Sequence, residues 1–346
     1  MHVAIDIREA TNPLKTGKGL WTKGFLDELL KRNIPLTTFS DRAFPSRAEE
    51  ITFSDSRLAW HLHVARALRT RKDITHYISP TSYIVPALSG ATCKIFPVVH
   101  DLIAFRGEPH DRKASFIERM TLGRAVRRAT GVLTVSDTTK KDLIDRFPDL
   151  DAQKVHSIFA GPKVASVRLS EPDGKTILCI GTLCPRKNQK RLIQAFAALP
   201  EFIRVGKELI LAGPRGWHDD EIISLAKETP GVTWKSYVSD EEYESLLHRA
   251  TVVALPSLYE GFGLLVLDAL QRGIPTLISD RGSLTEVAGE SCVRADPQNI
   301  SSIAAGLQKL LTDAVLRETL HVSGPVQAER FSWKRTVDLA LQTLET

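Results

Sequence analysis

Short apolar segments rich in valine and isoleucine alternate along the chain with longer segments in which apolar residues recur every three or four positions. The short segments are typical of buried β-strands and the longer ones of amphipathic helices. In the first half the predicted strands are His2–Ile7, Pro35–Phe39, Thr75–Ser79, Lys94–His100, Gly131–Val135 and Val155–Phe159. The predicted helices between them are Leu20–Lys31, Leu58–Arg69, Ser115–Ala129 and Lys140–Phe147.

The same alternation begins again in the second half. The predicted strands there are Thr176–Gly181, Glu208–Ala212, Val232–Lys235, Val252–Leu255 and Pro275–Ser279. The predicted helices are Gln189–Leu199, Glu221–Lys227, Asp240–Arg249, Leu264–Arg272 and Ile300–Leu311. An alternation that occurs twice predicts an α/β protein with two doubly wound parallel sheets. Ligands of such sheets bind outside the carboxyl ends of the strands.

The length of the chain and its Gly and Pro residues predict where the two domains meet. At 346 residues the chain exceeds the ~250–300 residues at which a single core stops growing. Gly and Pro interrupt the pattern between Ala160 and Asp173. We expect one domain over residues 1–165 and a second over 166–330. A C-terminal helix over 331–346, after Ser323-Gly-Pro325, is expected to pack back on the first domain.

The composition, with 42% hydrophobic and 25% charged residues, is that of an ordinary globular protein. No apolar stretch reaches the ~18–20 residues of a membrane-spanning helix. Charges in Met1–Arg8 fall where a signal peptide has its apolar core. Cys93, Cys179, Cys184 and Cys292 lack the spacing of a zinc site. We therefore expect a cytoplasmic enzyme without a cysteine metal site.

Charge is distributed unevenly along the chain. Residues 1–170 hold 27 Lys+Arg and 18 Asp+Glu, a net of +9, whereas residues 171–346 hold 19 and 23, a net of −4. Either this distribution has no function, or the first half meets an anion such as a phosphate or a membrane surface. Cations interleave with Phe116, Ile117 and Met120, which suits a helix on an anionic leaflet and equally one packed beside its sheet. No stacking-aromatic platform favours nucleic acid, and we expect none to bind.

The first candidate motif is Ile180-Gly-Thr-Leu-Cys-Pro-Arg-Lys-Asn188. It joins the end of a predicted strand to the start of a predicted helix and contains a glycine and two cations. Free N–H groups at a helix start, together with Arg186 and Lys187, can neutralise a diphosphate. A plain strand–helix turn with two solvated cations has the same composition. The spacing of a Walker loop is absent.

Glycines and acids coincide after the predicted strand Val252–Leu255, in Glu260-Gly-Phe-Gly-Leu264. The two glycines allow close approach of a ligand to the backbone at a helix start. Glu260 is expected at the carboxyl edge of the sheet, and Asp268 about two turns along the helix. Alternatively, Glu260 caps the helix and Asp268 is solvated. The coincidence of glycines, acids and a strand end favours a ligand site.

These motifs resemble those of the retaining glycosyltransferases of family 4, which have the GT-B fold. The resemblance covers nearly the whole chain in the family's order: Ile5-Asp-Ile7 with Gly17-Lys-Gly19, Val98-Val-His-Asp-Leu102, Thr134–Leu143, Gly181–Asn188, Leu211–Trp217, Glu260–Asp268, Ser279–Gly289 and Phe331-Ser-Trp333. It implies two Rossmann-like domains facing across a cleft. The second domain would hold most of a nucleotide-sugar donor, and the anomeric configuration would be retained.

The resemblance also implies roles for residues of the second domain. Lys187 and Arg186, in the turn that begins at Gly181, match the cations that bind the donor diphosphate. Glu260 matches an acid near the transferred sugar. The backbone amides of Phe262, Gly263 and Leu264 would face sugar and phosphate. Asp268 stands where the family usually has a glutamate that holds the ribose hydroxyls. Its shorter side chain implies a looser or water-mediated ribose contact.

In the first domain the resemblance implies four site residues. Gly17 and Gly19 match a glycine loop near the donor phosphates and the acceptor, and His100 matches a histidine that contacts the sugar. Asp101 is expected to order the acceptor side. From the residues alone, a glycine pair before a helix and a histidine at a strand end are equally well structural. Residues 158–161 depart from the family's proline–glycine turn.

We expect neither a cofactor nor a metal ion, because the predicted cations can neutralise the leaving diphosphate. The sequence Asp149-Leu-Asp151 resembles the metal-binding D-x-D of the other glycosyltransferase fold, but its setting after Phe147-Pro148 fits a polar loop better.

The expected reaction moves a hexose from a nucleotide-diphosphate sugar to a saccharide or lipid-linked saccharide. The motif Gly181–Asn188 resembles enzymes of bacterial polysaccharide assembly, so GDP-mannose is the first choice of donor. The enzyme would be cytoplasmic, or peripheral on the inner face of the cytoplasmic membrane. Two alternatives stay open: a catalytically inactive homologue that serves as a partner subunit, and a nucleotide-sugar epimerase or hydrolase on the same fold.

Overall fold

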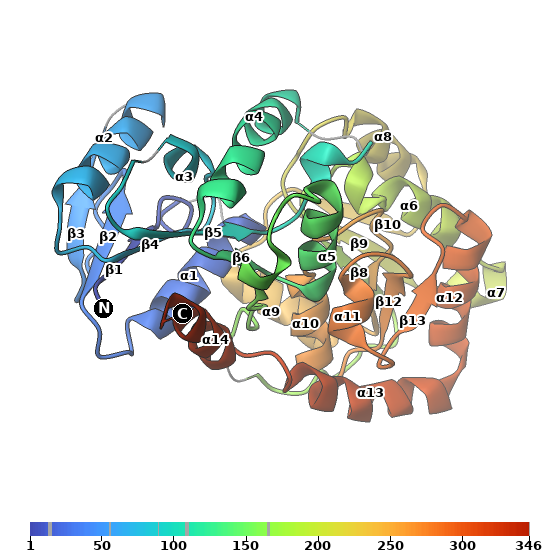
Figure 1. Ribbon diagram of the computed structural model, residues 1–346. Helices are drawn as coiled ribbons and strands as arrows, with labels where there is room; N and C mark the ends of the chain where they lie inside the picture. The colour runs from blue at the N-terminus through green and yellow to red at the C-terminus, as the bar shows by residue number, and fades with distance from the viewer. Residues whose placement is uncertain (13–15, 55–56, 89, 108–110, 165–166, 346) are drawn as a thin grey trace. The chain divides into compact units, whose positions relative to one another are not determined.

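The computed structural model describes residues 1–12, 16–54, 57–88, 90–107, 111–164 and 167–345 (Figure 1). The chain forms two compact units. The first comprises Met1–Arg106, Arg112–Lys163 and Phe331–Thr346, and the second comprises Gly107–Asp111 and Val164–Arg330. The C-terminal segment therefore belongs to the first unit.

The first unit is built on a parallel sheet. Its strands are β1 (Val3–Asp6), β2 (Leu36–Ser40), β3 (Glu49–Thr52), β4 (His76–Ser79), β5 (Lys94–Val99), β6 (Val132–Thr134) and β7 (Val155–Ser157). They lie in the order β3-β2-β1-β4-β5-β6-β7. The direction of winding reverses between β1 and β4, as in a doubly wound Rossmann sheet.

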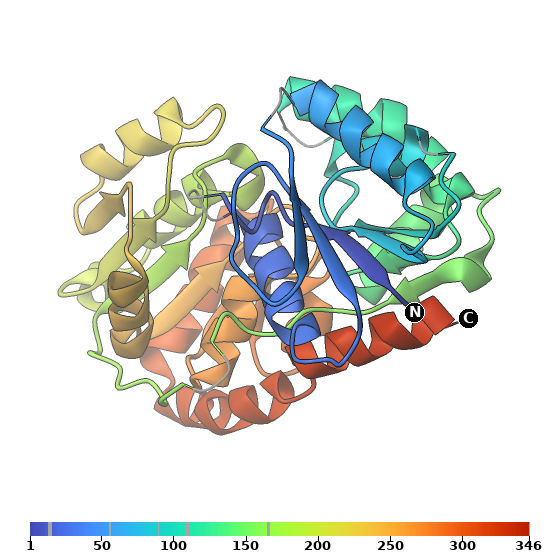
Figure 2. The ribbon, with the colours of Figure 1, turned by 90° about the vertical axis from the view of Figure 1, so that its left-hand side faces the viewer.

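Helices cover both faces of this sheet. They are α1 (Gly17–Leu29), α2 (Arg57–Thr70), α3 (Ile84–Leu88), α4 (Arg112–Arg128), α5 (Asp137–Arg146) and α14 (Trp333–Glu345), with the short 3-10 turns η1 (Ile103–Phe105) and η2 (Ala152–Lys154). The helices α2, α3 and α4 lie side by side on one face, and α1 packs with α14 on the other (Figures 1 and 2).

Trp333, the first residue of α14, fixes this helix to the first unit. Its indole Nε1 donates to the carbonyl oxygen of Pro162 at 2.8 Å, and its ring lies edge-on to Trp21 of α1 with the centroids 6.0 Å apart. Trp21 in turn donates to the carbonyl oxygen of Phe159 at 2.9 Å. The φ angle of Phe159 is 63°. Residues 158–161, which depart from the family's turn, therefore contain one residue in the left-handed conformation, Phe159. The hydrogen bond from Trp21 holds this segment against α1.

The second unit repeats the same sheet order. Its strands are β8 (Thr176–Ile180), β9 (Glu208–Ala212), β10 (Val232–Lys235), β11 (Val252–Leu255), β12 (Thr276–Ser279) and β13 (Val293–Ala295). The parallel order is β10-β9-β8-β11-β12-β13, which reverses between β8 and β11. The central strands β8 and β11 are almost completely buried. The predicted fold class, with two Rossmann-like parallel sheets, is confirmed.

The helices of the second unit form two layers. They are α6 (Gln189–Ala197), α7 (Glu201–Arg204), α8 (Asp220–Glu228), α9 (Asp240–Arg249), α10 (Leu264–Gln271), α11 (Leu284–Ala288), α12 (Ile300–Thr312) and α13 (Ala314–Ala328), with the 3-10 turn η3 (Pro185–Lys187). The helix α6 packs with α8 and α12, whereas α10 packs with α11 and α13 (Figure 1).

The structure differs from the predicted elements at the sheet edges and near the C-terminus. The strands β3 and β13 were not predicted, because edge strands are short and less buried and so lack a continuous apolar run. The helix α13 was not predicted either, and it continues through Pro325 to Ala328. Packing of α13 on α10, where Gly324 lies close to the backbone of Leu270, outweighs the low helix propensity of proline.

Two further features of the structure are the lengths of its apolar helices and the state of its cysteines. Among the described residues, no helix combines the length and the apolar character needed to cross a bilayer. The four cysteines are free thiols. Burial raises the pKa of the Cys179 thiol to about 12, which makes it unreactive at neutral pH.

Candidate active site

Two loops predicted to carry chemistry follow neighbouring strands of the second sheet. The first, residues 181–188, follows β8, and the second, residues 256–263, follows β11. The two strands pair in parallel where the strand order reverses. The loops also contact directly, because the N–H of Leu258 donates to the carbonyl oxygen of Arg186 at 2.8 Å. This is the position at which doubly wound sheets bind their ligands.

The first loop turns so that Lys187 faces the end of β8. Gly181 has a φ angle of 151°, and a side chain there would lie 3.3 Å from Cε of Lys187. Asn188 has a left-handed φ angle of 61°. Its side-chain amide donates to the carbonyl oxygens of Pro256 at 2.8 Å and Pro297 at 2.7 Å. Asn188 therefore ties the first loop to the second.

Glu260 pairs with both predicted cations. Its Oε2 lies 2.9 Å from Nη1 of Arg186, and its Oε1 lies 2.7 Å from Nζ of Lys187. Arg186 also donates to the carbonyl oxygen of Tyr259 at 2.8 Å. Side chains from the two loops thus form one ion-pair cluster. We refer to Arg186 and Lys187 as the cation pair.

The cation pair keeps the carboxyl of Glu260 ionised in spite of its burial. Glu260 is 8% exposed. Burial alone would raise the pKa of its carboxyl, but the charges of Arg186 and Lys187 outweigh burial and lower the pKa to about 2. Glu260 is therefore ionised at neutral pH. Two cations and one carboxylate leave one positive charge at a half-buried position, which favours an anionic ligand.

The turn before α10 is fixed from two sides. Gly263 has a φ angle of 108°, and a side chain there would lie 2.5 Å from Cδ2 of Leu284. Ser283 donates to the carbonyl oxygen of Phe262 at 3.1 Å. Leu264 is the first residue of α10. The turn therefore requires glycine at position 263. The free N–H groups of the first turn of α10 begin at Leu264, four residues after Glu260.

Asp268 lies further along α10 and is only 1% exposed. Its Oδ2 accepts a hydrogen bond of 2.5 Å from the hydroxyl of Tyr243, on α9. Burial, together with the charge of Asp268, raises the pKa of Tyr243 well above its ordinary value, so the phenol keeps its proton. The alternative of a solvated Asp268 does not hold, because this carboxylate is buried against α9.

The first unit places its four predicted residues at the carboxyl edge of its own sheet. Gly17 and Gly19 begin α1, which follows β1, whereas His100 and Asp101 follow β5. A side chain at Gly19 would lie 2.5 Å from the carbonyl oxygen of Glu9, while one at Gly17 would have no described atom within 4 Å. Gly19 is therefore required for packing within the unit, whereas no described residue requires a glycine at position 17.

His100 is a neutral, buried histidine. Its Nε2 lies 2.7 Å from the carbonyl oxygen of Pro80. Because a carbonyl oxygen only accepts, Nε2 carries the proton and Nδ1 is left as an acceptor. Burial, followed by the charge of Lys18, lowers the pKa of His100 to about 3. The neighbouring Asp101 accepts a hydrogen bond of 3.1 Å from the N–H of Ile103.

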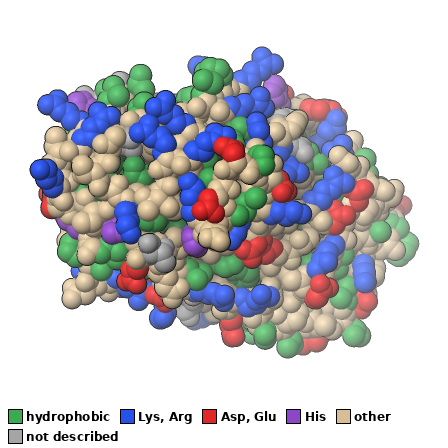
Figure 3. Space-filling model, viewed as in Figure 1, with side chains coloured by type: hydrophobic (Ala, Val, Ile, Leu, Met, Phe, Trp, Pro, Cys, Tyr) green, Lys and Arg blue, Asp and Glu red, His purple; other side chains and the backbone are tan. Residues whose placement is uncertain are grey.

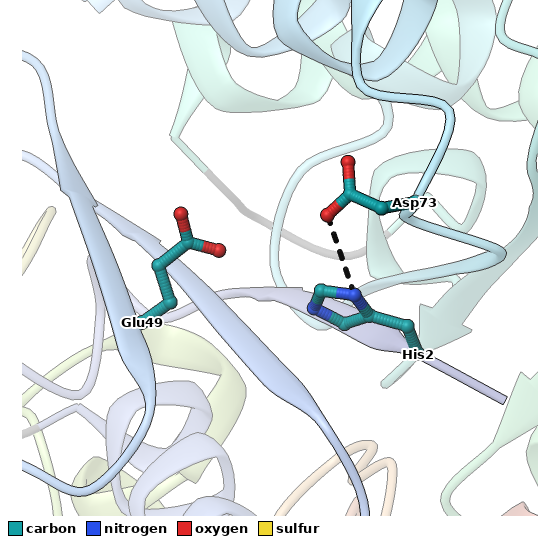
Figure 4. Close-up of side chains that lie close together, drawn as sticks. All are labelled: His2, Glu49 and Asp73. Atoms are coloured by element: carbon teal, nitrogen blue, oxygen red, sulfur yellow. Dashed lines mark ion pairs between the residues drawn. The ribbon is translucent and has the colours of Figure 1, made fainter.

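Within the described ranges, His2, Glu49 and Asp73 lie close enough together to share a metal ion (Figure 4). Nδ1 of His2 is 3.4 Å from Oδ2 of Asp73. Arg71, however, lies 2.7 Å from Glu49 and 2.6 Å from Asp73. Its hydrogen bonds lower the pKa of Asp73 to about 2. We interpret this group as an ion-pair cluster centred on Arg71.

The D-x-D sequence also has structural partners. Asp149 accepts two hydrogen bonds from Arg127, at 2.6 and 3.0 Å. Asp151 caps η2 by accepting from the N–H of Gln153 at 2.9 Å. Both acids therefore stabilise the polar loop in which they lie.

Sequence reasoning found the charged residues of the second unit but missed the polar side chains that hold them. Asn188 was part of the quoted motif, and its position between a turn and a helix was the available signal. Ser283, directly before α11, and Tyr243 of α9 contact the site, and no local pattern marked either of them.

The chain is similar to known proteins over most of its length. Residues 163–324 match the family model described as glycosyl transferases group 1. Over 306 residues the chain is 31% identical to O-antigen chain mannosyltransferase B of Escherichia coli, which covers 83% of this chain and 78% of that protein. The chain belongs to the group 1 glycosyltransferases.

Solved structures show the same fold for this glycosyltransferase. Sucrose-phosphate synthase from Thermosynechococcus elongatus has a TM-score of 0.80 at 17% identity, covering 99% of this chain and 97% of that one. Anabaena Alr3699/HepE, solved with UDP and glucose, has a TM-score of 0.79 at 15% identity, covering 100% of both chains. At such low identity the likeness concerns the fold alone.

Proposed function

We propose that this glycosyltransferase moves a hexose from a nucleotide-diphosphate sugar to a saccharide with retention of the anomeric configuration. The observation that carries the proposal is the half-buried cation pair held by the buried carboxylate of Glu260. It lies at the carboxyl edge of the second sheet, where β8 and β11 reverse the strand order. A diphosphate is the ligand group that best matches two adjacent cations beside a helix start.

The charges that develop during transfer fit this arrangement. The bond between C1 of the sugar and the phosphate oxygen breaks, which leaves negative charge on the diphosphate. Positive charges fixed beside the leaving group stabilise that transition state, and such terms are usually large. In the path that we favour, the acceptor oxygen attacks C1 from the face that the diphosphate leaves. The acceptor's proton passes to the departing phosphate oxygen, and no metal ion is needed.

In this proposal Glu260 orients the cation pair and lies near the transferred sugar. Because both its carboxylate oxygens face cations, Glu260 is a poor candidate for a covalent nucleophile. The N–H groups around Phe262, Gly263 and Leu264 would face the sugar and phosphate. Asp268, held by Tyr243, would serve the nucleoside side of the site.

We assign the acceptor to the first unit. His100 is neutral, and its Nδ1 is an acceptor that suits a sugar hydroxyl. Asp101 follows β5 and Gly17 follows β1, so both lie at the carboxyl edge of the same sheet.

The proposed donor is GDP-mannose, and the proposed product belongs to a cell-surface polysaccharide. The name of the similar Escherichia coli protein, O-antigen chain mannosyltransferase B, supports both the sugar and the polymer. The Anabaena neighbour was solved with UDP and glucose, so a UDP-sugar is the natural competitor in any test.

We further propose that the first unit binds an anionic membrane surface through α2 and α4. Leu58 and Leu62 of α2 are 63% and 53% exposed, and Phe116 and Met120 of α4 are each 66% exposed. Lys and Arg side chains flank the hydrophobic ones over both helices (Figure 3). Exposed apolar side chains among cations are typical of a surface that meets acidic lipid headgroups.

A donor panel tests the proposed reaction. The protein is incubated with GDP-mannose, UDP-glucose and dTDP-rhamnose, with and without mannose-terminated oligosaccharides, and nucleotide release and the product anomer are followed by NMR. We expect acceptor-dependent release of GDP and an α-mannoside product. Release that is independent of acceptor would indicate a hydrolase, and absence of donor binding and of turnover would indicate an inactive homologue.

A further inference from the structure

The buried face of α4 contains a carboxyl group at a position where an apolar residue is expected. Leu122, Ala125 and Val126 on this face are buried in the core of the first unit. Glu118, one turn before Leu122, is 8% exposed. Its Oε1 is buried and accepts no hydrogen bond from any residue that the structure describes. An unpaired buried acceptor costs stability, so its presence calls for a ligand or another function.

The topology places Glu118 at the carboxyl edge of the first sheet. The helix α4 follows β5 and leads to β6, so its first turns lie at that edge, where it packs against η1. The charges of Lys18 and Asp101 are close enough to shift the pKa of the Glu118 carboxyl, after burial, in opposite directions. Lys18 lies between Gly17 and Gly19. Glu118 therefore faces the same edge as the residues assigned to the acceptor.

The protonation of Glu118 is consistent with this placement. Burial raises its pKa to about 7, while the charge of Lys18 opposes this rise and that of Asp101 adds to it. Burial raises the pKa of the Tyr83 phenol, and the charges of Glu118 and Asp101 add to this rise. Tyr83 belongs to the same core cluster as Leu122 of α4. The groups that face Glu118 thus combine one cation, one acid and a neutral phenol.

We propose that Lys18, Asp101 and Glu118 form a subsite for the hydroxyl groups of a neutral saccharide acceptor. A sugar hydroxyl would donate to the unpaired Oε1 of Glu118, and Lys18 would donate to a neighbouring sugar oxygen. Because the subsite holds two acids and a single cation, it disfavours a phosphate at this point. The inference rests on the proposed function and deepens it, since it places a sugar ring rather than a lipid phosphate beside α4.

Two substitutions test the subsite. Glu118→Gln keeps the size of the side chain and removes its charge, and Glu118→Leu removes both polar atoms. Glu28→Gln is the matched control, because Glu28 is a buried acid of the same unit that pairs with Lys31 and Arg32 at the other end of α1. Steady-state transfer is measured with methyl α-mannoside oligomers as acceptors, and GDP-mannose is titrated separately.

We expect the KM for acceptor to rise at least tenfold in Glu118→Gln and further in Glu118→Leu, with the KM for donor within twofold of wild type. The melting temperature of Glu118→Leu should equal or exceed that of wild type, because the unpaired acceptor is gone. Acceptor KM values within twofold of wild type in both variants would overturn the subsite. A tenfold rise in Glu28→Gln would do the same, since the effect would then be structural.

A second measurement separates failure of the subsite from failure of the proposed function. Binding of methyl α-mannoside and of mannose 6-phosphate to the full chain is compared by saturation-transfer NMR, without donor. We expect the neutral glycoside to bind more tightly than the phosphate and to lose its signal in Glu118→Gln. Tighter binding of the phosphate, or no glycoside binding by wild type, would overturn the subsite even if GDP-mannose is turned over.

Discussion

The ammonium of Lys187 lies 2.7 Å from Oε1 of Glu260, although three strands (β9, β10 and β11) and four helices (α6 to α9) separate the two residues in the chain. They meet because β8 and β11 are neighbours at the point where the sheet reverses its order. The winding of the sheet thus assembles the cation pair and its carboxylate from distant segments. In our proposal the same ion pair holds the loops in place and prepares the site for a diphosphate.

The low pKa of Glu260 predicts how this cluster contributes to stability as the pH changes. Its pKa of about 2 lies below the ordinary value of 4.5, so the contribution is complete above about pH 4.5 and is lost as the pH falls towards 2. We expect Glu260→Gln to be less stable at neutral pH, with a flatter decline of unfolding free energy below pH 4.5. Urea unfolding at several pH values measures both.

Glu221→Gln is the control for this experiment, because Glu221 is an exposed acid of α8 that pairs with Lys190. Its unfolding free energy should follow that of wild type at every pH, as expected for a surface ion pair. Identical slopes for wild type and Glu260→Gln below pH 4.5 would contradict the assignment of the low pKa to Glu260.

The contact between Asp268 and Tyr243 predicts that the family's usual glutamate does not fit here. Asp268→Glu adds one methylene to a side chain that is 1% exposed and already in contact with the phenol. We expect it to lower the unfolding free energy by about 1–3 kcal/mol. Adding Tyr243→Phe should recover part of that loss. A fully stable Asp268→Glu variant with tighter donor binding would show that the site has room for the longer acid.

The surface of α2 and α4 predicts membrane binding that depends on lipid charge. Phe116→Ser with Met120→Ser should reduce flotation with vesicles of phosphatidylcholine and phosphatidylglycerol, and leave turnover of soluble acceptors unchanged. Phe202→Ser is the control, because Phe202 is 83% exposed and lies in the second unit. Equal flotation with vesicles of phosphatidylcholine alone, or equal flotation of all variants, speaks against this surface.

The contacts of Trp333 predict that α14 stabilises the first unit. Trp333→Ala removes the hydrogen bond to Pro162 and the contact with Trp21, and we expect a loss of about 2–4 kcal/mol in unfolding free energy. Lys334→Ala should change it by less than about 1 kcal/mol, since the Lys334 side chain makes an exposed ion pair with Asp338. Thermal and urea unfolding of the two variants give the comparison. Similar values for both would mean that α14 contributes little.

The sequence predicted the central strands well, because buried parallel strands are continuous apolar runs bounded by turns. The buried inner strands β9 and β11 have the bounds expected from the pattern. The edge strand β3, with two glutamates among its four residues, has no such run. The helix α13 continues through Pro325 because of packing on α10, which is a tertiary effect that local propensity does not contain.

The candidate site was predictable where charged residues and glycines directly follow a predicted strand. Gly181, the cation pair and Glu260 each follow a strand, and topology then brings them together. Tyr243 and Glu118 lie within helices that read as ordinary amphipathic segments. Their roles depend on which face the fold buries and on what lies opposite, and only the three-dimensional structure supplies that.

The central claim is that the cation pair binds and stabilises the donor diphosphate. The most direct measurement is acceptor-dependent release of GDP from GDP-mannose by wild type, Lys187→Ala and Lys190→Ala, each checked for unchanged folding by circular dichroism. Lys190 is the matched control, because it lies three residues after Lys187, in the first turn of α6, and pairs with the exposed Glu221. We predict that kcat/KM falls by about 10²–10³ in Lys187→Ala and stays within twofold of wild type in Lys190→Ala. Near-normal turnover by a folded Lys187→Ala protein would contradict the account.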